Sequence, residues 1–284
     1  MAGRCSELSE AAGEPLAATA VTARAWLLVE VGGSWPRDVA VDGALPVDAG
    51  QAVTDWLAAT PRSRVHFIRR PGRAGSRVVF VVRSEEARQD VRRFELERIE
   101  DLPALDLAEG GEPHDGSLVL ICGHGSRDRC CALRGTAVFG ALAERLGDEE
   151  LWISSHQGGH RFAANVLVLP SGLQFGRVEP SEAPYLVGRA IAGRIAVDRY
   201  RGRTFYEPSV QAGEHAVRAA AGLDGAGELE LASHGDGLVR FRAWDGTEWT
   251  VAVEEAEGPS VPPSCGDEPV PQRTFRSRIV ARGI

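Results

Sequence analysis

Residues 118–135 read LVLICGHGSRDRCCALRG, and residues 151–165 read LWISSHQGGHRFAAN. Both stretches open on an apolar run that predicts a buried strand, over residues 117–121 and 150–154. Between these strands the pattern predicts a helix over residues 129–146. This order is typical of an α/β fold, in which the ends of neighbouring strands gather at one edge of the sheet.

Four side chains that can bind a metal follow these two strands. They are Cys122 at the end of the first strand, Cys131 at the start of the helix, and His156 and His160 in the loop after the second strand. Because the strand ends meet at one edge, we expect all four side chains to converge. Two thiolates and two imidazoles suit zinc, iron or an iron-sulfur cluster, and they do not suit magnesium or calcium.

The spacing of the ligands favours a [2Fe-2S] cluster over a zinc ion. A zinc finger places its cysteines two to four residues apart and its histidines on a helix. Here eight residues separate Cys122 from Cys131, and the pair Gly158-Gly159 disfavours a helix, since each glycine costs about 1 kcal/mol relative to alanine. Long loops suit a flat two-iron cluster, and glycines let backbone amides approach its sulfur atoms. Zinc on the same ligands stays the alternative.

The roles of the remaining cysteines, and of two other residues near the motifs, are less well defined by the sequence. Any single cysteine or histidine is more often a buried thiol or a hydrogen-bonded loop residue than a ligand, but four candidates on two neighbouring loops favour a shared site. Cys130 is expected to be a buried thiol beside the site, and Cys5 and Cys265 are expected to be structural. His124 is either a donor to the site or an ordinary loop residue, and Arg161 either brings positive charge to the site or lies in solvent.

Residues 26–83 and 117–178 share the order strand, helix, strand, strand. The first copy is expected to hold a strand over 26–31, a helix opened by a capping box of Asp48 and Gln51, and strands over 64–70 and 77–83. Its loop over 71–75 corresponds to the histidine loop at 157–161 but has no histidine or cysteine. The first copy is therefore interpreted as scaffold without a cluster. Residues 84–116, charged and then rich in Gly and Pro, predict a connector.

The rest of the chain is expected to be an appendage. A helix over 181–197 completes the second copy; it is followed by a helix over 208–223 and by strands over 228–233, 238–244 and 248–254. The last 30 residues, rich in Pro and Ser, predict a loop or tail. The pattern divides the chain into an N-terminal unit (1–110), a unit that carries the cluster (111–200) and a C-terminal helix, β-meander and tail (201–284).

The amino-acid composition limits the kinds of molecule that the protein is expected to bind. The net charge of -8 argues against binding to nucleic acid, which calls for a basic surface. The N-terminus lacks the pattern of a secretory signal, and no apolar run approaches the roughly 20 residues of a membrane span. We therefore expect a soluble, cytoplasmic protein with a protein partner. Five cysteines do not form a disulfide framework in that compartment.

The motifs CGHGSRDRCC (122–131), HQGGHRFAAN (156–165), GEPL (13–16) and SCG (264–266) resemble the sucrase/ferredoxin-like family, a branch of the thioredoxin-like [2Fe-2S] ferredoxins. The resemblance spans nearly the whole chain. It implies two thioredoxin-like units in tandem and a cluster held by C-x8-C and H-x-G-G-H, that is, by Cys122, Cys131, His156 and His160. Cys130 departs from the pattern and leaves open which thiolate of the adjacent pair binds iron.

The function expected from these features is one-electron transfer to an unidentified redox partner protein. Two cysteinates and two neutral histidines make the oxidised cluster formally neutral, so its potential is expected above that of plant-type ferredoxins. Because each histidine keeps a titratable outer nitrogen, reduction is expected to take up a proton. The sequence favours a non-catalytic carrier over an enzyme. A zinc-stabilised interaction module, a redox sensor and a thiol oxidoreductase using Cys130-Cys131 are the alternatives.

Overall fold

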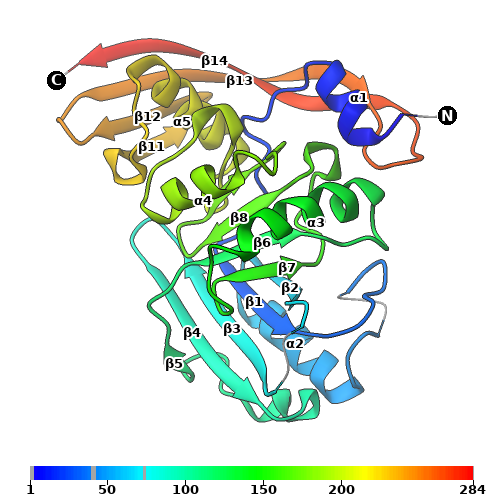
Figure 1. Ribbon diagram of the computed structural model, residues 1–284. Coiled ribbons are helices and arrows are strands. Elements are labelled where there is room, and N and C mark those ends of the chain that lie inside the picture. Colours follow the sequence, from blue (N-terminus) through cyan, green and yellow to red (C-terminus); the bar gives the residue numbers. More distant parts are fainter. Residues whose placement is uncertain (1–2, 40–42, 73–74, 284) are drawn as a thin grey trace.

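A mixed sheet of ten strands runs through the body of the molecule, in the order β10-β9-β8-β6-β7-β2-β1-β3-β4-β5 (Figure 1). The computed structural model describes residues 3–39, 43–72 and 75–283. The strands of this sheet are β1 (Ala25–Glu30), β2 (Ser63–Arg69), β3 (Arg77–Ser84), β4 (Gln89–Leu96), β5 (Glu112–Pro113), β6 (Leu118–Cys122), β7 (Leu151–Ser154), β8 (Val166–Leu169), β9 (Leu173–Phe175) and β10 (Tyr200–Arg203). With the helices that pack on it, the sheet confirms the predicted α/β class.

The two halves of the sheet repeat one strand order. β1 pairs in parallel with β2 and antiparallel with β3, and β6 pairs in parallel with β7 and antiparallel with β8. The halves join where β2 meets β7 in an antiparallel pair, with Ile68 opposite Ser154. The thioredoxin-like character of each unit stays a prediction, and residues 73–74 of the loop predicted to match the histidine loop lie outside the described residues.

Both faces of the central strands are buried, which explains their unbroken apolar runs. On one face, Leu27 and Val29 of β1 share a core with three helices: α2 (Val47–Ala59), α3 (Arg129–Ala143) and α4 (Ala183–Ile191). On the other face, side chains of both halves meet: Phe80 of β3 lies against Trp152 of β7, with ring centroids 6.0 Å apart. The two copies therefore share a hydrophobic core.

Two helix predictions need correction. α2 begins at Val47 after Pro46, and no side chain caps it, so the expected capping box of Asp48 and Gln51 is wrong. Because the helix starts one residue earlier, Gln51 instead donates a hydrogen bond to Asp55 one turn later, at 2.7 Å. The helix predicted over 181–197 is shorter, since α4 ends at Ile191 and Gly193 follows with φ of +71°.

The predicted connector over 84–116 contains regular structure. β4 pairs with β3 along its whole length, from Arg77 opposite Leu96 to Ser84 opposite Gln89. The 3-10 helix η1 (Ile99–Ala104) and the short strand β5 follow. Charged residues between Val91 and Leu96 conceal the strand in the sequence, although Val91, Phe94 and Leu96 are buried.

The C-terminal region forms a second sheet, of four strands, beside helix α5 (Pro208–Ala221). Its strands are β11 (Leu229–Gly235), β12 (Leu238–Ala243), β13 (Glu248–Val261) and β14 (Val270–Gly283). The predicted tail is wrong, because β14 pairs with β13 from Glu248 opposite Gly283 to Val261 opposite Val270. Of the prolines in the tail sequence, Pro259 lies in β13 where its register with β14 shifts, Pro271 lies at the start of β14, and the others lie in the loop between the two strands.

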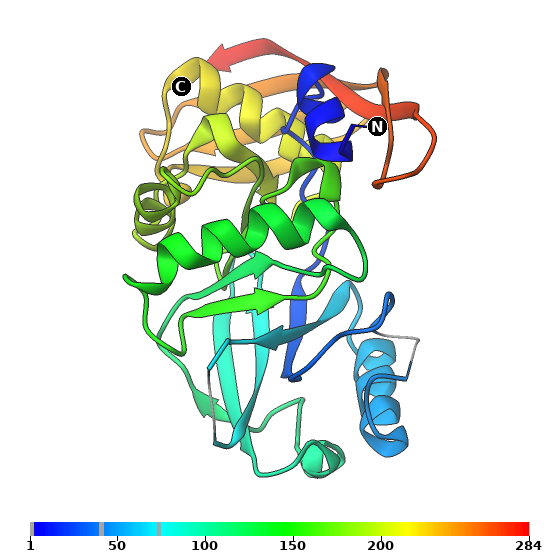
Figure 2. The same ribbon diagram turned by 45° about the vertical axis from the view of Figure 1, so that its right-hand side comes forward.

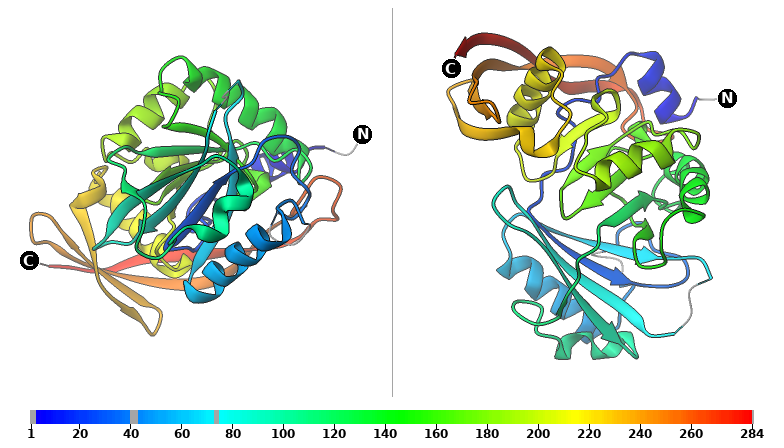
Figure 3. Two further views of the ribbon diagram at one scale, coloured as in Figure 1. Left: turned by 90° about the horizontal axis from the view of Figure 1, so that it is seen from below. Right: turned by 60° about the vertical axis from the view of Figure 1, so that its left-hand side comes forward.

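The first helix lies far from the rest of the N-terminal half. α1 (Cys5–Ala11) sits between the second half of the large sheet and the loop that joins β13 to β14, as Figures 2 and 3 show from several sides. The strand-like segment after α1 continues along β10, where Thr19 N–H donates to the Arg201 carbonyl. Within the described part of the chain, no helix is both long and apolar enough to cross a bilayer.

A buried ion pair joins α5 to the large sheet and makes a testable stability prediction. Glu214 of α5 pairs with Arg203 Nε of β10 at 3.1 Å, and it accepts hydrogen bonds from Arg218 Nε of its own helix at 3.0 Å and from Tyr200 Oη of β10 at 2.9 Å; all four residues are buried. Glu214→Gln should lower the free energy of unfolding by about 3–5 kcal/mol, because it leaves the Arg218 charge uncompensated.

The matched control for this prediction is Glu248→Gln. Glu248 pairs with Arg242 at 3.1 Å, but both side chains are about 60% exposed, so the expected loss is below about 1 kcal/mol. Urea unfolding followed by circular dichroism measures both losses. Equal losses in the two variants would show that the buried pair does not stabilise the junction between α5 and β10.

Candidate metal centre

The four predicted ligands lie in two loops that leave neighbouring parallel strands. Cys122 is the last residue of β6, and Cys131 lies in the first turn of α3. His156 follows β7 by two residues, and His160 opens the 3-10 helix η2 (His160–Phe162). We call residues 122–131 the Cys loop and residues 156–165 the His loop. Because Cys122 pairs with Ser154, both loops start at the same edge of the sheet.

Three of the four ligands converge closely. The sulfur atoms of Cys122 and Cys131 and a ring nitrogen of His156 lie within 4.8 Å of one another. Among the described residues, this set of three does not include His160, whose ring stacks on that of His156 with centroids 4.2 Å apart and planes 25° apart. The structure therefore brings the two thiols and the two imidazole rings close together, as expected from strand ends that gather at one edge of the sheet.

Glycines allow the His loop its shape. Gly158 and Gly159 have φ of +89° and +72°, a region that residues with a side chain rarely adopt. A Cβ atom on Gly158 would lie 2.5 Å from Val21, and one on Gly159 would lie 2.7 Å from the buried guanidinium of Arg201. Both glycines of the H-x-G-G-H motif are thus required by backbone conformation and by close packing.

The ionisation of the site suits metal binding. A hydrogen bond from the Cys131 thiol, with help from the adjacent His156 ring and the Gln157 backbone N–H, lowers the pKa of Cys122 well below its ordinary value. The same hydrogen bond raises the pKa of Cys131. Burial lowers the pKa of His160 to about 4. At neutral pH the site therefore offers a thiolate and a neutral imidazole, the forms that bind metal ions.

His124 connects the two loops and is not a ligand. Its Nδ1 accepts a hydrogen bond from the His156 backbone N–H at 3.1 Å, so its Nε2 must carry the proton and donate to the Pro36 carbonyl at 2.7 Å. Burial lowers the pKa of His124, which keeps this ring neutral. The sequence suggested a donor to the site or an ordinary loop residue; the structure instead shows a ring that accepts a hydrogen bond from the His156 backbone and so positions the His loop.

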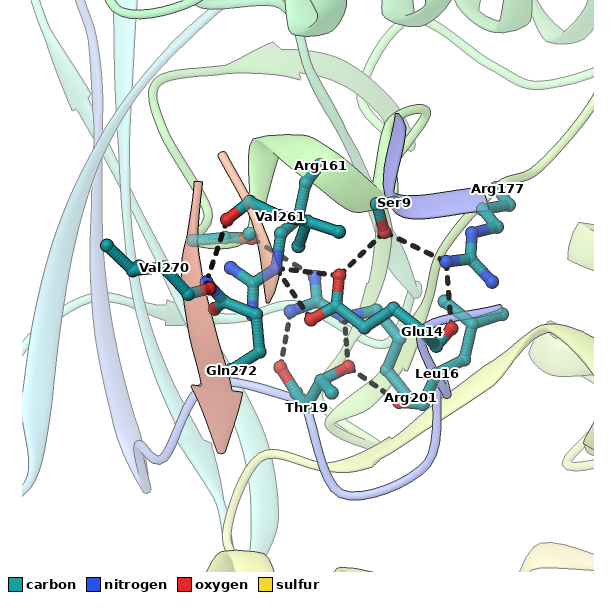
Figure 4. Close-up of polar contacts among 12 residues, drawn as sticks. Ser9, Glu14, Leu16, Thr19, Arg161, Arg177, Arg201, Val261, Val270 and Gln272 are labelled. Carbon is teal, nitrogen blue, oxygen red and sulfur yellow. Dashed lines mark hydrogen bonds and ion pairs between the residues drawn. The ribbon is translucent and has the colours of Figure 1, made fainter. Parts of the chain in front are cut away.

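Residues 9–19 support the His loop from the outside (Figure 4). Arg161 Nε donates to Glu14 at 2.7 Å, and Glu14 is almost fully buried. The Arg161 charge is thus neutralised by a carboxylate, whereas the sequence suggested either a free positive charge at the site or a solvated one. Ser9 Oγ also donates to Glu14, at 2.7 Å.

Arg201, which sequence reasoning missed, holds the other side of the His loop. Its Nη1 donates to Asn165 Oδ1 at 2.8 Å and to the Gly158 carbonyl at 3.1 Å, while Asn165 Nδ2 donates to the Gly159 carbonyl at 2.9 Å. Burial lowers the pKa of Arg201 to about 9. β10 reads YRGR, so no apolar run marks Arg201 as buried, and its partners are 36 to 182 positions away.

The other three cysteines also gather, against expectation for Cys5 and Cys265. The sulfur of Cys130 lies 3.6 Å from that of Cys5 and 3.3 Å from that of Cys265. Together with Cys122, Cys131 and Ala163 they form one buried cluster, so all five cysteines of the chain lie together. No spacing rule could have found this, because the three thiols come from residues 5, 130 and 265.

The close packing of α3 on the Cys loop gives a prediction. A Cβ atom on Gly135, one turn after Cys131, would lie 2.1 Å from the Cys122 carbonyl oxygen. Gly135→Ala should therefore push α3 away from Cys122 and lower the free energy of unfolding by about 1–3 kcal/mol. Gly140 of the same helix is the control, since a Cβ there meets nothing within 4 Å.

Gly140→Ala should raise the free energy of unfolding by up to about 1 kcal/mol, the difference in helix propensity. Denaturant titration of the two variants and the parent protein measures both effects. If Gly135→Ala were as harmless as Gly140→Ala, the tight contact between α3 and Cys122 would not exist in solution.

Comparison with known proteins identifies several that are similar to this chain. Altered inheritance of mitochondria protein 32 of Eremothecium gossypii is 34% identical over 106 residues, which are 32% of this chain and 34% of that protein. The protein of the same name from Meyerozyma guilliermondii is 37% identical over 95 residues, 30% of this chain and 34% of the relative. That from Debaryomyces hansenii is 36% identical over 95 residues, 30% of this chain and 35% of the relative. The matched segment spans about a third of the length of these curated relatives.

A family model gives the wider match. The model described as sucrase/ferredoxin-like covers residues 16–202, which include the Cys loop, the His loop and all but the last residue of the ten-stranded sheet. The match extends over well more than half of the 284 residues. The chain therefore belongs to the sucrase/ferredoxin-like family.

Proposed function

We propose that the chain binds a [2Fe-2S] cluster through Cys122, Cys131, His156 and His160 and acts as a one-electron carrier. The observation that carries this proposal is the convergence of two thiols and the His156 ring within 4.8 Å, with His160 stacked beside them. When bound, such a cluster accepts and releases single electrons. The residues of the chain hold it, exclude water from it and set its charge.

Unsatisfied atoms at the site support the fit. Nδ1 of His156 and Nδ1 of His160 are both buried and have no hydrogen-bond partner among the described residues. A buried polar atom without a partner is costly, and binding to iron through Nδ1 would remove that cost at both rings. The Gln157 backbone N–H, which points at the Cys122 sulfur, is the kind of donor that stabilises a reduced iron-sulfur centre.

With Nδ1 bound, Nε2 is the atom on each ring that holds or releases a proton. The two rings differ in access to water: His160 is 8% exposed, whereas His156 is only half-buried and lines a cleft of about 360 Å³. We therefore assign most of the proton exchange to Nε2 of His156. The redox partner would approach through the same cleft, whose lining has three basic side chains, Arg37, Arg64 and Arg127, and one acidic side chain, Asp38.

The ligand assignment predicts the outcome of single substitutions. Anaerobically purified protein should be coloured and contain about two iron and two sulfide per chain. Replacing Cys122, Cys131, His156 or His160 by alanine should remove most of the iron and sulfide, because each change deletes a donor. Cys130→Ala is the matched control and should keep both.

Absorption spectra with iron, sulfide and zinc counts measure these outcomes. If Cys130→Ala bleached the protein and Cys131→Ala did not, the assignment within the adjacent pair would be wrong. If the protein contained zinc and no sulfide, and lost the zinc in Cys122→Ala and His156→Ala, it would be a zinc-stabilised module and not an electron carrier.

The histidine ligands predict a potential that depends on pH. The outer nitrogen of a bound imidazole is more acidic when the iron is oxidised, so reduction takes up a proton between the two pKa values. In that range the potential should fall by about 59 mV per pH unit, and below both pKa values it should be flat.

Protein-film voltammetry of the parent and of two variants tests this dependence. His156→Cys should lower the potential and remove most of the slope, whereas His160→Cys should lower the potential and keep more of it, because His156 has the better access to water. A potential that is constant over the pH range, or unchanged in both variants, would mean that the histidines do not bind iron.

A further inference from the structure

Three thiols that lie outside the predicted cluster site form a triangle. The sulfur-sulfur distances are 3.6 Å between Cys5 and Cys130, 3.3 Å between Cys130 and Cys265, and 3.5 Å between Cys265 and Cys5. Thiolates on one tetrahedral zinc ion, at ~2.3 Å from it, lie about 3.8 Å apart. The triangle therefore needs to open by only a few tenths of an ångström to surround an ion.

A carboxylate completes the set. Asp128 Oδ1 lies 3.8 Å from the Cys5 sulfur and 3.5 Å from the Cys265 sulfur. An oxygen and a sulfur that share a tetrahedral zinc ion are separated by about 3.5 Å. Three hydrogen bonds hold the carboxylate in place. Cys130 N donates to Oδ1 at 2.7 Å. Cys265 N and Ser264 Oγ donate to Oδ2 at 2.8 Å and 2.9 Å. Besides the Cys130 N–H, the only donors to Oδ1 that the structure describes are the thiols of Cys5 and Cys265, whose protons leave when a metal ion binds, so Oδ1 can serve as the fourth ligand.

We propose that Cys5, Cys130, Cys265 and Asp128 form a second metal site that binds a zinc ion and is separate from the proposed cluster. Three thiolates and a carboxylate suit zinc and do not suit magnesium or calcium. Four protein ligands leave no open position, so the site is structural and not catalytic. It does not depend on the function proposed for Cys122, Cys131, His156 and His160.

The burial of the ligands supports a built site. Cys5 and Cys130 are fully buried, Asp128 is 4% exposed, and Cys265 is the one ligand at the surface. Ser6 Oγ donates a hydrogen bond to the Cys130 sulfur at 3.2 Å, as a partner of a metal-bound thiolate does. A disulfide would join only two of the three sulfurs, at about 2.05 Å, and would leave the third without a role.

The site would fasten three segments that are distant in the sequence. α1 has seven residues, too few for a stable isolated helix. Cys265 lies in the loop between β13 and β14, which Gln272 closes with hydrogen bonds from Nε2 to the Val261 carbonyl at 3.1 Å and the Val270 carbonyl at 2.9 Å (Figure 4). The ion holds this helix and this loop on the N-terminus of α3, which also carries Cys131.

Metal analysis of the full-length protein tests the proposal. Protein purified anaerobically should contain about one zinc per chain in addition to any iron, and exchange with cobalt should give the strong near-ultraviolet absorption of cobalt-thiolate bonds. Cys265→Ser and Cys5→Ser should reduce the zinc from about one to about zero per chain while the iron and sulfide counts stay unchanged. Cys122→Ser is the matched control and should lose the iron while the zinc stays.

A second measurement does not depend on the folding of any variant. Removing zinc from the parent protein with a chelator should speed proteolysis within residues 5–11 and within the β13–β14 loop several-fold, and adding zinc back should restore protection. The proposal is wrong if the parent binds neither zinc nor cobalt, if the zinc is lost in Cys122→Ser and kept in Cys265→Ser, or if mass spectrometry finds two of the three thiols joined as a disulfide in the anaerobic protein.

Discussion

β6 and β7 pair in parallel, with Cys122 opposite Ser154, and the geometry of the metal centre follows from this register. Two parallel strands finish at the same edge of a sheet, so the loops that leave them must start side by side. A shift of one residue would turn Cys122 to the other face of the sheet and separate it from His156. The apolar contact of Phe80 with Trp152 and the short β2–β7 pair fix β7 from its other side. The register is thus held by the core of both halves of the sheet.

Residue pattern predicted those parts of the molecule whose partners lie nearby in the chain. The apolar runs of β1 and β6 located the strands, and the C-x8-C and H-x-G-G-H spacings picked out side chains that lie close together in the structure, because each loop lies next to the strand that positions it. The pattern failed for β4, where charged side chains obscure the alternation of a half-buried strand, and for β14, most of whose side chains are exposed. It also failed for Cys5 and Cys265, because their contacts cross more than 120 positions.

The His loop depends on charges that the N-terminal segment supplies. Glu14 is buried against Arg161, and Arg201 is buried with bonds to Thr19 and Asn165. Removing one member of a buried ionic pair costs more than the pair itself contributes, because the remaining charge has no compensation. Residues 9–19 are therefore part of the site's support, although they precede the first strand of the sheet by sequence. Residues 9–19 fall within the predicted N-terminal unit (1–110), but they contact the His loop of the predicted second unit (111–200).

The gathering of all five cysteines at the start of α3 sets the order in which the protein can mature. Cys5 leaves the ribosome well before Cys265, which lies 260 positions later in the chain. At a synthesis rate of about 5–20 residues per second, roughly 13 to 52 s pass between them. During that interval α1 has no β13–β14 loop to pack against, and its thiol faces solvent. Chaperones, oxidants and metal donors of the cell therefore meet the open Cys5 thiol, and the buried arrangement forms only after Cys265 has been translated.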